Sequence, residues 1–191
     1  TRGLDADGNE ITRDSDETIR PDTSLEKLAA LKPVLGTDWI TAGISSPVTD
    51  GASAVVLMSE DKATELGVTP LARVVANAVV GSDPVLMLTG PLTATPKVLA
   101  KAGMKIEDID IFEVNEAFAP VPLAWAKELN APMEKLNVNG GAMALGHPVG
   151  NSGCRLAITA VNELARRQAK YALVTLCTGG AQAPATIFER V

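Results

Sequence analysis

The only histidine of the chain, His147, lies in a segment whose composition suits close contact with a ligand. It follows Gly146 within residues 139–153, where five of fifteen residues are glycine. Glycine lets the backbone pass where a side chain would not fit, so such a loop can approach a bound molecule closely. The spacing of these glycines matches neither the dinucleotide fingerprint nor the phosphate-binding P-loop. His147 is therefore either a hydrogen-bonding or proton-transferring group at a ligand site, or a loop residue that bonds only to backbone.

Cys177 is the second candidate for chemistry, because it ends an apolar segment and is followed by Thr178 and two glycines. Backbone N–H groups beside a thiol can lower its pKa, so Cys177 could act as a thiolate or as an acid/base catalyst. The alternative is a small buried apolar side chain, as for most free cysteines. Cys154, one turn into a predicted helix, fits that alternative better.

Asn115 stands where a predicted strand over residues 109–114 meets a predicted helix over residues 117–129. It could cap that helix. It could instead hold a water or a ligand carbonyl, because open α/β sheets bind ligands at the carboxyl ends of their strands. Asn115, His147 and Cys177 each stand at the end of an α/β unit, so we expect them to converge on one cleft.

The hydrophobic pattern predicts the elements that must position these residues, with strands and helices alternating as in a layered α/β domain. We expect strands over residues 54–58 (a buried one), 71–80, 109–114, 171–177 and 185–191. We expect helices over residues 25–32, 60–66, 95–102, 117–129 and 152–167.

Residues 1–24 are predicted to form an exposed acidic loop. The spacing of Asp5, Asp7 and Asn9 is similar to a calcium-binding loop, but Glu10 occupies the position where that loop needs glycine. We therefore expect a solvated turn here and no metal site.

Composition limits what the chain can bind. Its 191 residues are 46% hydrophobic but only 3% aromatic, and the net charge is −6. A negative charge and few aromatic rings argue against a nucleic-acid partner. No apolar run approaches the ~18–20 residues of a membrane span. Two cysteines are too few for a disulfide framework, so we expect a reducing compartment, the cytoplasm.

Three motifs together resemble the thiolase family. They are Asn-Glu-Ala-Phe-Ala at 115–119, the glycine-rich segment with Gly-His-Pro at 139–153, and Cys-x-Gly-Gly at 177–180. Their order and spacing are those of thiolases, and residues 41–52 resemble the family segment that leads into its C-terminal half. The likeness extends from about residue 20 to residue 191.

The resemblance implies a role for each of these residues. His147 would direct a ring nitrogen at the thioester oxygen, and Asn115 would hold a water beside it, so that the two form an oxyanion hole. Cys177 would be the general acid/base that removes or returns the α-proton of the acetyl group. The backbone N–H of Gly179 would join a second oxyanion hole.

The resemblance also implies contacts with coenzyme A. Ser46 matches a serine that contacts the coenzyme A arm, and Met87 matches a residue that lines the pantetheine tunnel. The chain departs from the family at Ala181 and Ala183, where glycines are common. Neither cysteine matches the motif of the nucleophilic cysteine, which lies in the N-terminal half of thiolases.

The fold implied is half of a five-layer αβαβα arrangement, with a mixed sheet layered between helices. We expect residues 1–49 to be the tail of an inserted loop domain and a linker, and residues 50–191 to be a C-terminal thiolase-like domain. The resemblance implies coenzyme A and acyl-CoA thioesters as substrates and no separate cofactor. It implies as partners an N-terminal half carrying the nucleophile, and further copies in a homo-oligomer.

Two functions stay open. The first is an acyl-CoA acyltransferase that cleaves or forms 3-ketoacyl-CoA, in which this chain supplies the acid/base and oxyanion groups. The second is a catalytically silent thiolase-like module that binds acyl-CoA or a subunit. Retention of Asn115, His147 and Cys177 favours the enzyme. A ketoacyl synthase relative is disfavoured. Those enzymes usually pair their nucleophile with two histidines, or with histidine and asparagine in differently spaced motifs, whereas this chain has a single histidine.

Overall fold

The computed structural model describes residues 2–5, 7–12, 14–16 and 18–191. The chain divides into two compact units, Thr1–Gly43 and Ile44–Val191. All the candidate site residues belong to the second unit. The predicted division between residues 49 and 50 stays a prediction.

The first unit contains a short hairpin where a loop is predicted. Strands β1 (Arg2–Leu4) and β2 (Glu10–Thr12) pair antiparallel. The Asp5 carboxylate accepts hydrogen bonds from the backbone N–H groups of Asp7 and Asn9, both at 2.9 Å. The acidic spacing therefore stabilises a turn. Helix α1 (Leu25–Ala29) begins after Ser24, whose hydroxyl caps it, but ends three residues earlier than predicted.

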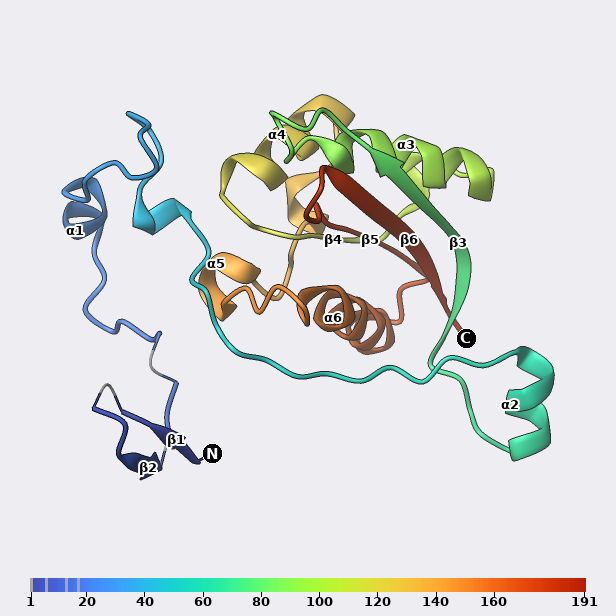
Figure 1. Ribbon diagram of the computed structural model, residues 1–191. Coiled ribbons are helices and arrows are strands. Elements are labelled where there is room, and N and C mark those ends of the chain that lie inside the picture. The colour runs from blue at the N-terminus through green and yellow to red at the C-terminus, as the bar shows by residue number, and fades with distance from the viewer. Residues whose placement is uncertain (1, 6, 13, 17) are drawn as a thin grey trace. The chain divides into compact units, whose positions relative to one another are not determined.

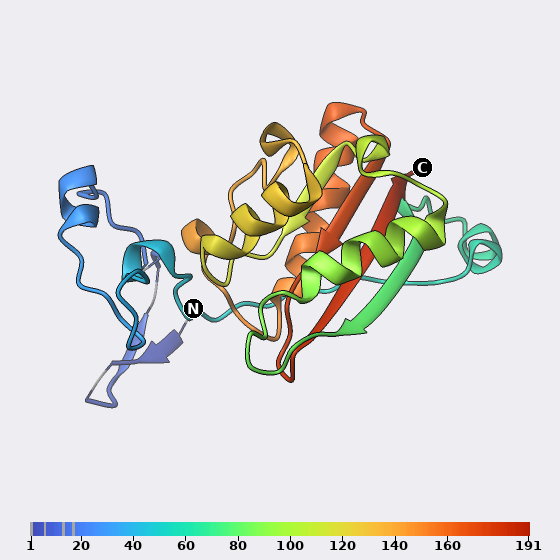
Figure 2. The same ribbon diagram turned by 90° about the horizontal axis from the view of Figure 1, so that it is seen from above.

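The second unit is built on a mixed sheet between helices, as predicted. Its strands follow the order β3-β6-β5-β4, in which β4 and β5 are parallel and the other pairs are antiparallel. Helices α3 and α4 cover one face of the sheet and α6 covers the other (Figures 1 and 2). The bounds are β3 Ala72–Gly81, α3 Gly90–Ala102, β4 Ile111–Val114, α4 Pro120–Leu129, α6 Ser152–Arg167, β5 Tyr171–Thr175 and β6 Gln182–Arg190.

Shorter elements connect these layers. Helix α2 (Glu60–Leu66) and helix α6 have the predicted bounds, and Gly67 ends α2 in the left-handed conformation with φ of 64°. The other short elements are the 3₁₀ turns Ala42–Ile44, Ile106–Asp108 and Met133–Lys135, and helix α5 (Ala142–Leu145). None of the helices in the described ranges combines the length and the apolar character that a bilayer crossing requires.

Two apolar clusters hold the layers together, one on each face of the sheet. On the face covered by α3 and α4, Phe112 packs against Trp125 with ring centroids 5.1 Å apart. On the other face, Ile111 packs with Leu156 and Leu164 of α6. Because side chains of a strand alternate between faces, Glu113 lies on the same face as Ile111, toward α6. This alternation decides which polar groups meet at the site.

Two helices differ from prediction at their starts. Helix α3 begins five residues earlier than predicted, at Gly90, and continues through Pro96. Helix α4 begins three residues later than predicted, because residues 117–119 bond to another segment. Ser46 donates its backbone N–H to Ala117 O (3.2 Å), and the Ala119 N–H donates to Ile44 O (2.9 Å).

The prediction of a buried strand over residues 54–58 is wrong. This segment has no regular secondary structure, and Val56 and Leu57 are 79% and 76% exposed. Its apolar composition is that of a buried strand, but within the described part of the chain no strand pairs with it. A strand needs a neighbour to satisfy its backbone hydrogen bonds, and composition alone cannot supply one.

Candidate active site

The parallel pair β4 and β5 brings two of the predicted residues to one edge of the sheet. Val114 pairs with Thr175 at the end of both strands, and the Asn115 N–H donates to Thr175 O (3.1 Å). Asn115 thus directly follows β4, and Cys177 lies two residues beyond the end of β5. Both residues leave the sheet at its carboxyl edge, where open α/β sheets bind ligands.

Asn115 and His147 meet, as predicted. The Asn115 Nδ2 atom lies 3.3 Å from His147 Nε2, although 32 residues separate the two in sequence. Asn115 is buried and His147 is half-buried. The alternative that Asn115 caps a helix is wrong, because the residue before α4 is Ala119. The carboxamide therefore contacts the imidazole and does not cap a helix.

A tight loop delivers His147 to this position. The backbone N–H of His147 donates to Pro47 O (2.9 Å), so the ring is anchored to a neighbouring segment. Gly146 has φ of 93°, and a Cβ atom there would overlap the side chain of Thr49. Glycine at 146 is thus required both by its backbone conformation and by the close approach of Thr49.

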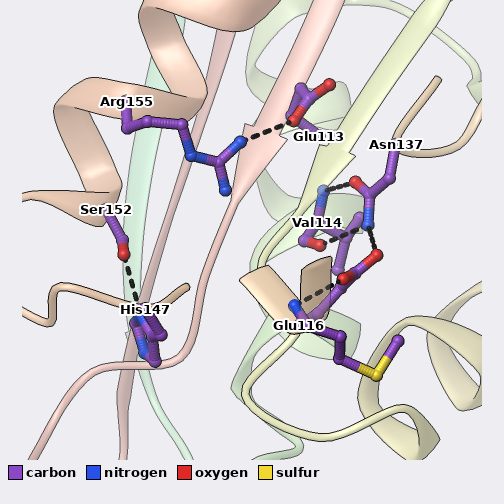
Figure 3. Close-up of polar contacts among 8 residues, drawn as sticks. Glu113, Val114, Glu116, Asn137, His147, Ser152 and Arg155 are labelled. Atoms are coloured by element: carbon purple, nitrogen blue, oxygen red, sulfur yellow. Dashed lines mark hydrogen bonds and ion pairs between the residues drawn. The ribbon is translucent and has the colours of Figure 1, made fainter. Parts of the chain in front are cut away.

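Both ring nitrogens of His147 have a polar neighbour. Its Nδ1 atom lies 2.6 Å from the Ser152 hydroxyl, at the first residue of α6 (Figure 3). Burial lowers the pKa of His147, and the positive charge of Arg155 lowers it further. The ring is therefore neutral at neutral pH, with one nitrogen donating and the other accepting.

A buried ion pair lies beside these groups. Arg155 of α6 approaches the Glu113 carboxylate of β4 to 3.5 Å, and the Glu113 side chain is fully buried (Figure 3). Burial raises the pKa of Glu113 to about 7, although Arg155 opposes the shift. In the described part of the chain, three buried atoms here have no hydrogen-bond partner: Glu113 Oε1, Asn115 Oδ1 and one Arg155 Nη.

A second polar network holds the end of β4. The Asn137 side chain accepts from the Val114 N–H (2.8 Å) and donates to Val114 O (2.9 Å), so it pairs with the edge of the sheet as a neighbouring strand would. It also donates to Glu116 (2.8 Å), whose carboxylate accepts from the Met143 N–H (3.0 Å) (Figure 3). These bonds fix the backbone on both sides of Asn115.

The loop after Cys177 differs from prediction in its electrostatics. Burial raises the pKa of the Cys177 thiol, so the expectation of a lowered pKa is wrong. Gly179 is exposed, and no described residue accepts from its N–H. Ala181, where thiolases commonly have glycine, has φ of 57°, a conformation that glycine adopts without strain.

Ser46 and Met87 lie on segments attached to the site's own loops. The Ser46 hydroxyl donates to Ala117 O (3.0 Å), two residues from Asn115. Met87 lies in a loop tied to the Cys177 hairpin, since the Ser82 hydroxyl is 3.3 Å from Met87 O and 3.0 Å from Ala181 O. Whether either residue contacts coenzyme A stays a prediction.

Two cavities lie close to these elements. One of about 330 Å³ lies between residues 49–53 and 148–151. The other, about 240 Å³, is lined by Glu116, Asn137 and Met143 together with apolar side chains. Asn115, His147 and Cys177 line neither. Among the described residues, no group of three or more histidine, cysteine or acidic side chains could hold a metal ion.

Sequence reasoning missed Glu113, Asn137, Ser152 and Arg155, which support the predicted residues. One signal was present for Glu113: a carboxylate inside an otherwise apolar strand is rarely buried without a partner. The others lie in loops or at a helix start, where a polar side chain has no distinguishing pattern.

Comparison with known proteins gives two family matches. The family model "Thiolase, C-terminal domain" matches residues 68–190, and "Thiolase, N-terminal domain" matches residues 2–61. The 3-ketoacyl-CoA thiolase of Vibrio vulnificus (strain YJ016) is 50% identical over 195 residues, which cover 100% of this chain and 50% of that protein. The 3-ketoacyl-CoA thiolase of Yersinia enterocolitica is 51% identical over 198 residues, covering 100% of this chain and 51% of that protein.

Solved structures agree. Human mitochondrial 3-ketoacyl-CoA thiolase has a TM-score of 0.90 at 46% identity, over 100% of this chain and 48% of that one. Bacillus anthracis acetyl-CoA acetyltransferase has a TM-score of 0.90 at 44% identity, over 96% of this chain and 47% of that one. A structure of the human protein in complex with CoA has a TM-score of 0.88 at 48% identity, over 92% of this chain and 45% of that one. The chain thus spans about half the length of the relatives it matches.

Proposed function

The chain belongs to the thiolase family, and from this premise we propose that it provides the acid/base and oxyanion-stabilising groups of an acyl-CoA acyltransferase. The reaction is the thiolysis of 3-ketoacyl-CoA by coenzyme A, or its reverse, a Claisen condensation. The observation that carries the proposal is the 3.3 Å approach of Asn115 to His147 at the sheet edge from which Cys177 also emerges.

The chemistry demands these groups together. An α-hydrogen of a thioester is weakly acidic, so its removal needs a positioned base and a stabilised enolate oxygen. In the proposed reaction, His147 donates to the thioester oxygen and Asn115 holds a water that donates to the same oxygen. Cys177 removes the α-proton during condensation and returns it to the α-carbon during thiolysis. The raised pKa of the thiol supports the second role, since the group is protonated before the enolate forms.

The remaining groups are proposed from the family. The Gly179 N–H stabilises the oxyanion of the acyl-transfer step, and Ser46 and Met87 contact coenzyme A. We also propose, from the resemblance, that the nucleophilic cysteine lies in the half of the relatives' length that this chain does not span. An N-terminal half and further copies in a homo-oligomer are therefore the proposed partners, and the cytoplasm is the proposed compartment.

Reconstitution tests the proposal. The purified chain is assayed for loss of acetoacetyl-CoA in the presence of coenzyme A, alone and mixed with the N-terminal half of a close relative. We expect no turnover alone, because covalent catalysis needs the nucleophile, and turnover in the mixture. Cys177→Ala and His147→Ala should abolish it, whereas the matched control Cys154→Ala, at an exposed cysteine, should retain it.

Turnover by the unmixed chain contradicts the division of catalytic groups. Full activity of Cys177→Ala contradicts the acid/base role. A mixture that binds coenzyme A but never turns over favours the alternative, a silent binding module.

A further inference from the structure

The two ring nitrogens of His147 face different partners, and only one of them can donate. Nδ1 lies 2.6 Å from Ser152 Oγ, and Nε2 lies 3.3 Å from Asn115 Nδ2. A neutral imidazole carries one proton. If Nδ1 holds it, Nε2 accepts from the Asn115 amide and offers no proton to a substrate. If Nε2 holds it, the imidazole and the amide are two donors that can share one acceptor.

The Ser152 hydroxyl decides between these states, because it has one proton and two possible acceptors. The first is His147 Nδ1 at 2.6 Å and the second is Pro148 O at 3.2 Å. Pro148 O already accepts the backbone N–H groups of Asn151 (2.8 Å) and Ser152 (2.9 Å). A carbonyl oxygen has two lone pairs, so both are engaged. The hydroxyl proton therefore goes to Nδ1, the nearer acceptor with a free lone pair.

We propose that Ser152 is a positioning residue that holds His147 in the tautomer with the proton on Nε2. Ser152 is 1% exposed and begins the 16-residue helix α6, so the helix fixes the position of its hydroxyl. The consequence for catalysis rests on the proposed function: only this tautomer can donate to the thioester oxygen without first binding a second proton.

The single histidine makes the tautomer directly measurable. Long-range ¹H–¹⁵N correlation spectra of the uniformly ¹⁵N-labelled chain distinguish a protonated from an unprotonated nitrogen at Nδ1 and Nε2. We expect the wild-type chain at neutral pH to show protonated Nε2 and unprotonated Nδ1. The readout needs no catalytic activity, so its result is separate from the success or failure of the proposed reaction.

Variants of Ser152 test whether its hydroxyl determines the tautomer of His147. In Ser152→Ala nothing donates to Nδ1, while Asn115 can still donate to Nε2, so the Nδ1–H tautomer should gain population. Ser152→Thr keeps the hydroxyl and should resemble the wild type. Ser53→Ala is the matched control. The Ser53 hydroxyl donates to Asn151, which lies in the same loop as His147, and not to the imidazole, so the spectrum of this variant should be unchanged.

Two results overturn the proposal: a wild-type spectrum with the proton on Nδ1, or a Ser152→Ala spectrum identical to that of the wild type. The first decides the question even if a variant fails to fold.

Discussion

Glu113→Gln should remove the loss of stability that Glu113 causes as pH rises from 4 to 8. Burial raises the pKa of Glu113 from its ordinary value of 4.5 to about 7. Below pH 4.5 the carboxyl is protonated in both the folded and the unfolded chain. Between pH 4.5 and 7 the unfolded chain releases a proton that the folded chain keeps, so the free energy of unfolding falls as pH rises. Above pH 7 the loss is complete.

The size of the effect follows from the two pKa values. At ~1.4 kcal/mol for each tenfold change in proton affinity, a rise from 4.5 to about 7 corresponds to about 3 kcal/mol. Glutamine stays neutral and cannot show this loss. It also removes the attraction between Arg155 and the ionised carboxylate, but that attraction is already contained in the pKa of about 7 and adds nothing further to the pH dependence. The difference in unfolding free energy between variant and wild type should therefore move by about 3 kcal/mol in favour of the variant from pH 4 to pH 8.

Urea unfolding at pH 4, 5, 6, 7 and 8 measures this difference, with midpoints followed by circular dichroism. The matched control is Glu134→Gln, which removes an exposed carboxylate from a 3₁₀ turn and should leave the pH profile unchanged. Parallel profiles for wild type and Glu113→Gln would refute the reasoning, since they would show that folding does not raise the pKa of the buried carboxyl.

Two further predictions concern the loops around the site. Gly146→Ala should destabilise the fold by at least ~1–2 kcal/mol, because φ is positive and a Cβ would overlap Thr49. The control Gly150→Ala, whose Cβ would have no atom within 4 Å, should cost far less. Equal losses of thermal stability in the two variants would contradict this prediction. Asn137→Ala should cost ~2–3 kcal/mol in urea unfolding, because it leaves the backbone N–H and C=O of Val114 unpaired, and a cost below ~0.5 kcal/mol would show that water replaces the side chain.

Local sequence signals predicted the bounds of two helices correctly. Helices α2 and α6 match their predicted bounds, because caps and periodicity are local properties. The prediction of a strand over residues 54–58 was wrong because a strand depends on a partner strand that is distant in sequence. The predicted start of α4 was wrong because residues 117–119 form backbone hydrogen bonds with residues 44–46, a contact that has no local sequence signal.

The prediction of the site was likewise right in some features and wrong in others. The residue types and their places at the ends of α/β units predicted that Asn115 and His147 would meet, and they do. The sequence could not predict the sign of the Cys177 pKa shift, because burial outweighs the neighbouring backbone N–H groups only in the folded loop. Ser152 and Arg155 were missed because their effect passes through other side chains, and only distances reveal it.

Residues 54–58 are exposed and apolar, and we expect them to make the chain prone to aggregate. Their backbone groups are open, and two valines, a leucine and a methionine give them the composition from which identical segments stack into intermolecular sheets. Concentrated samples should therefore nucleate such sheets at this stretch, and a lysine in place of Val56 should delay them by charge repulsion. Covering this stretch with a binding partner would then be expected to keep the protein dispersed in concentrated solution.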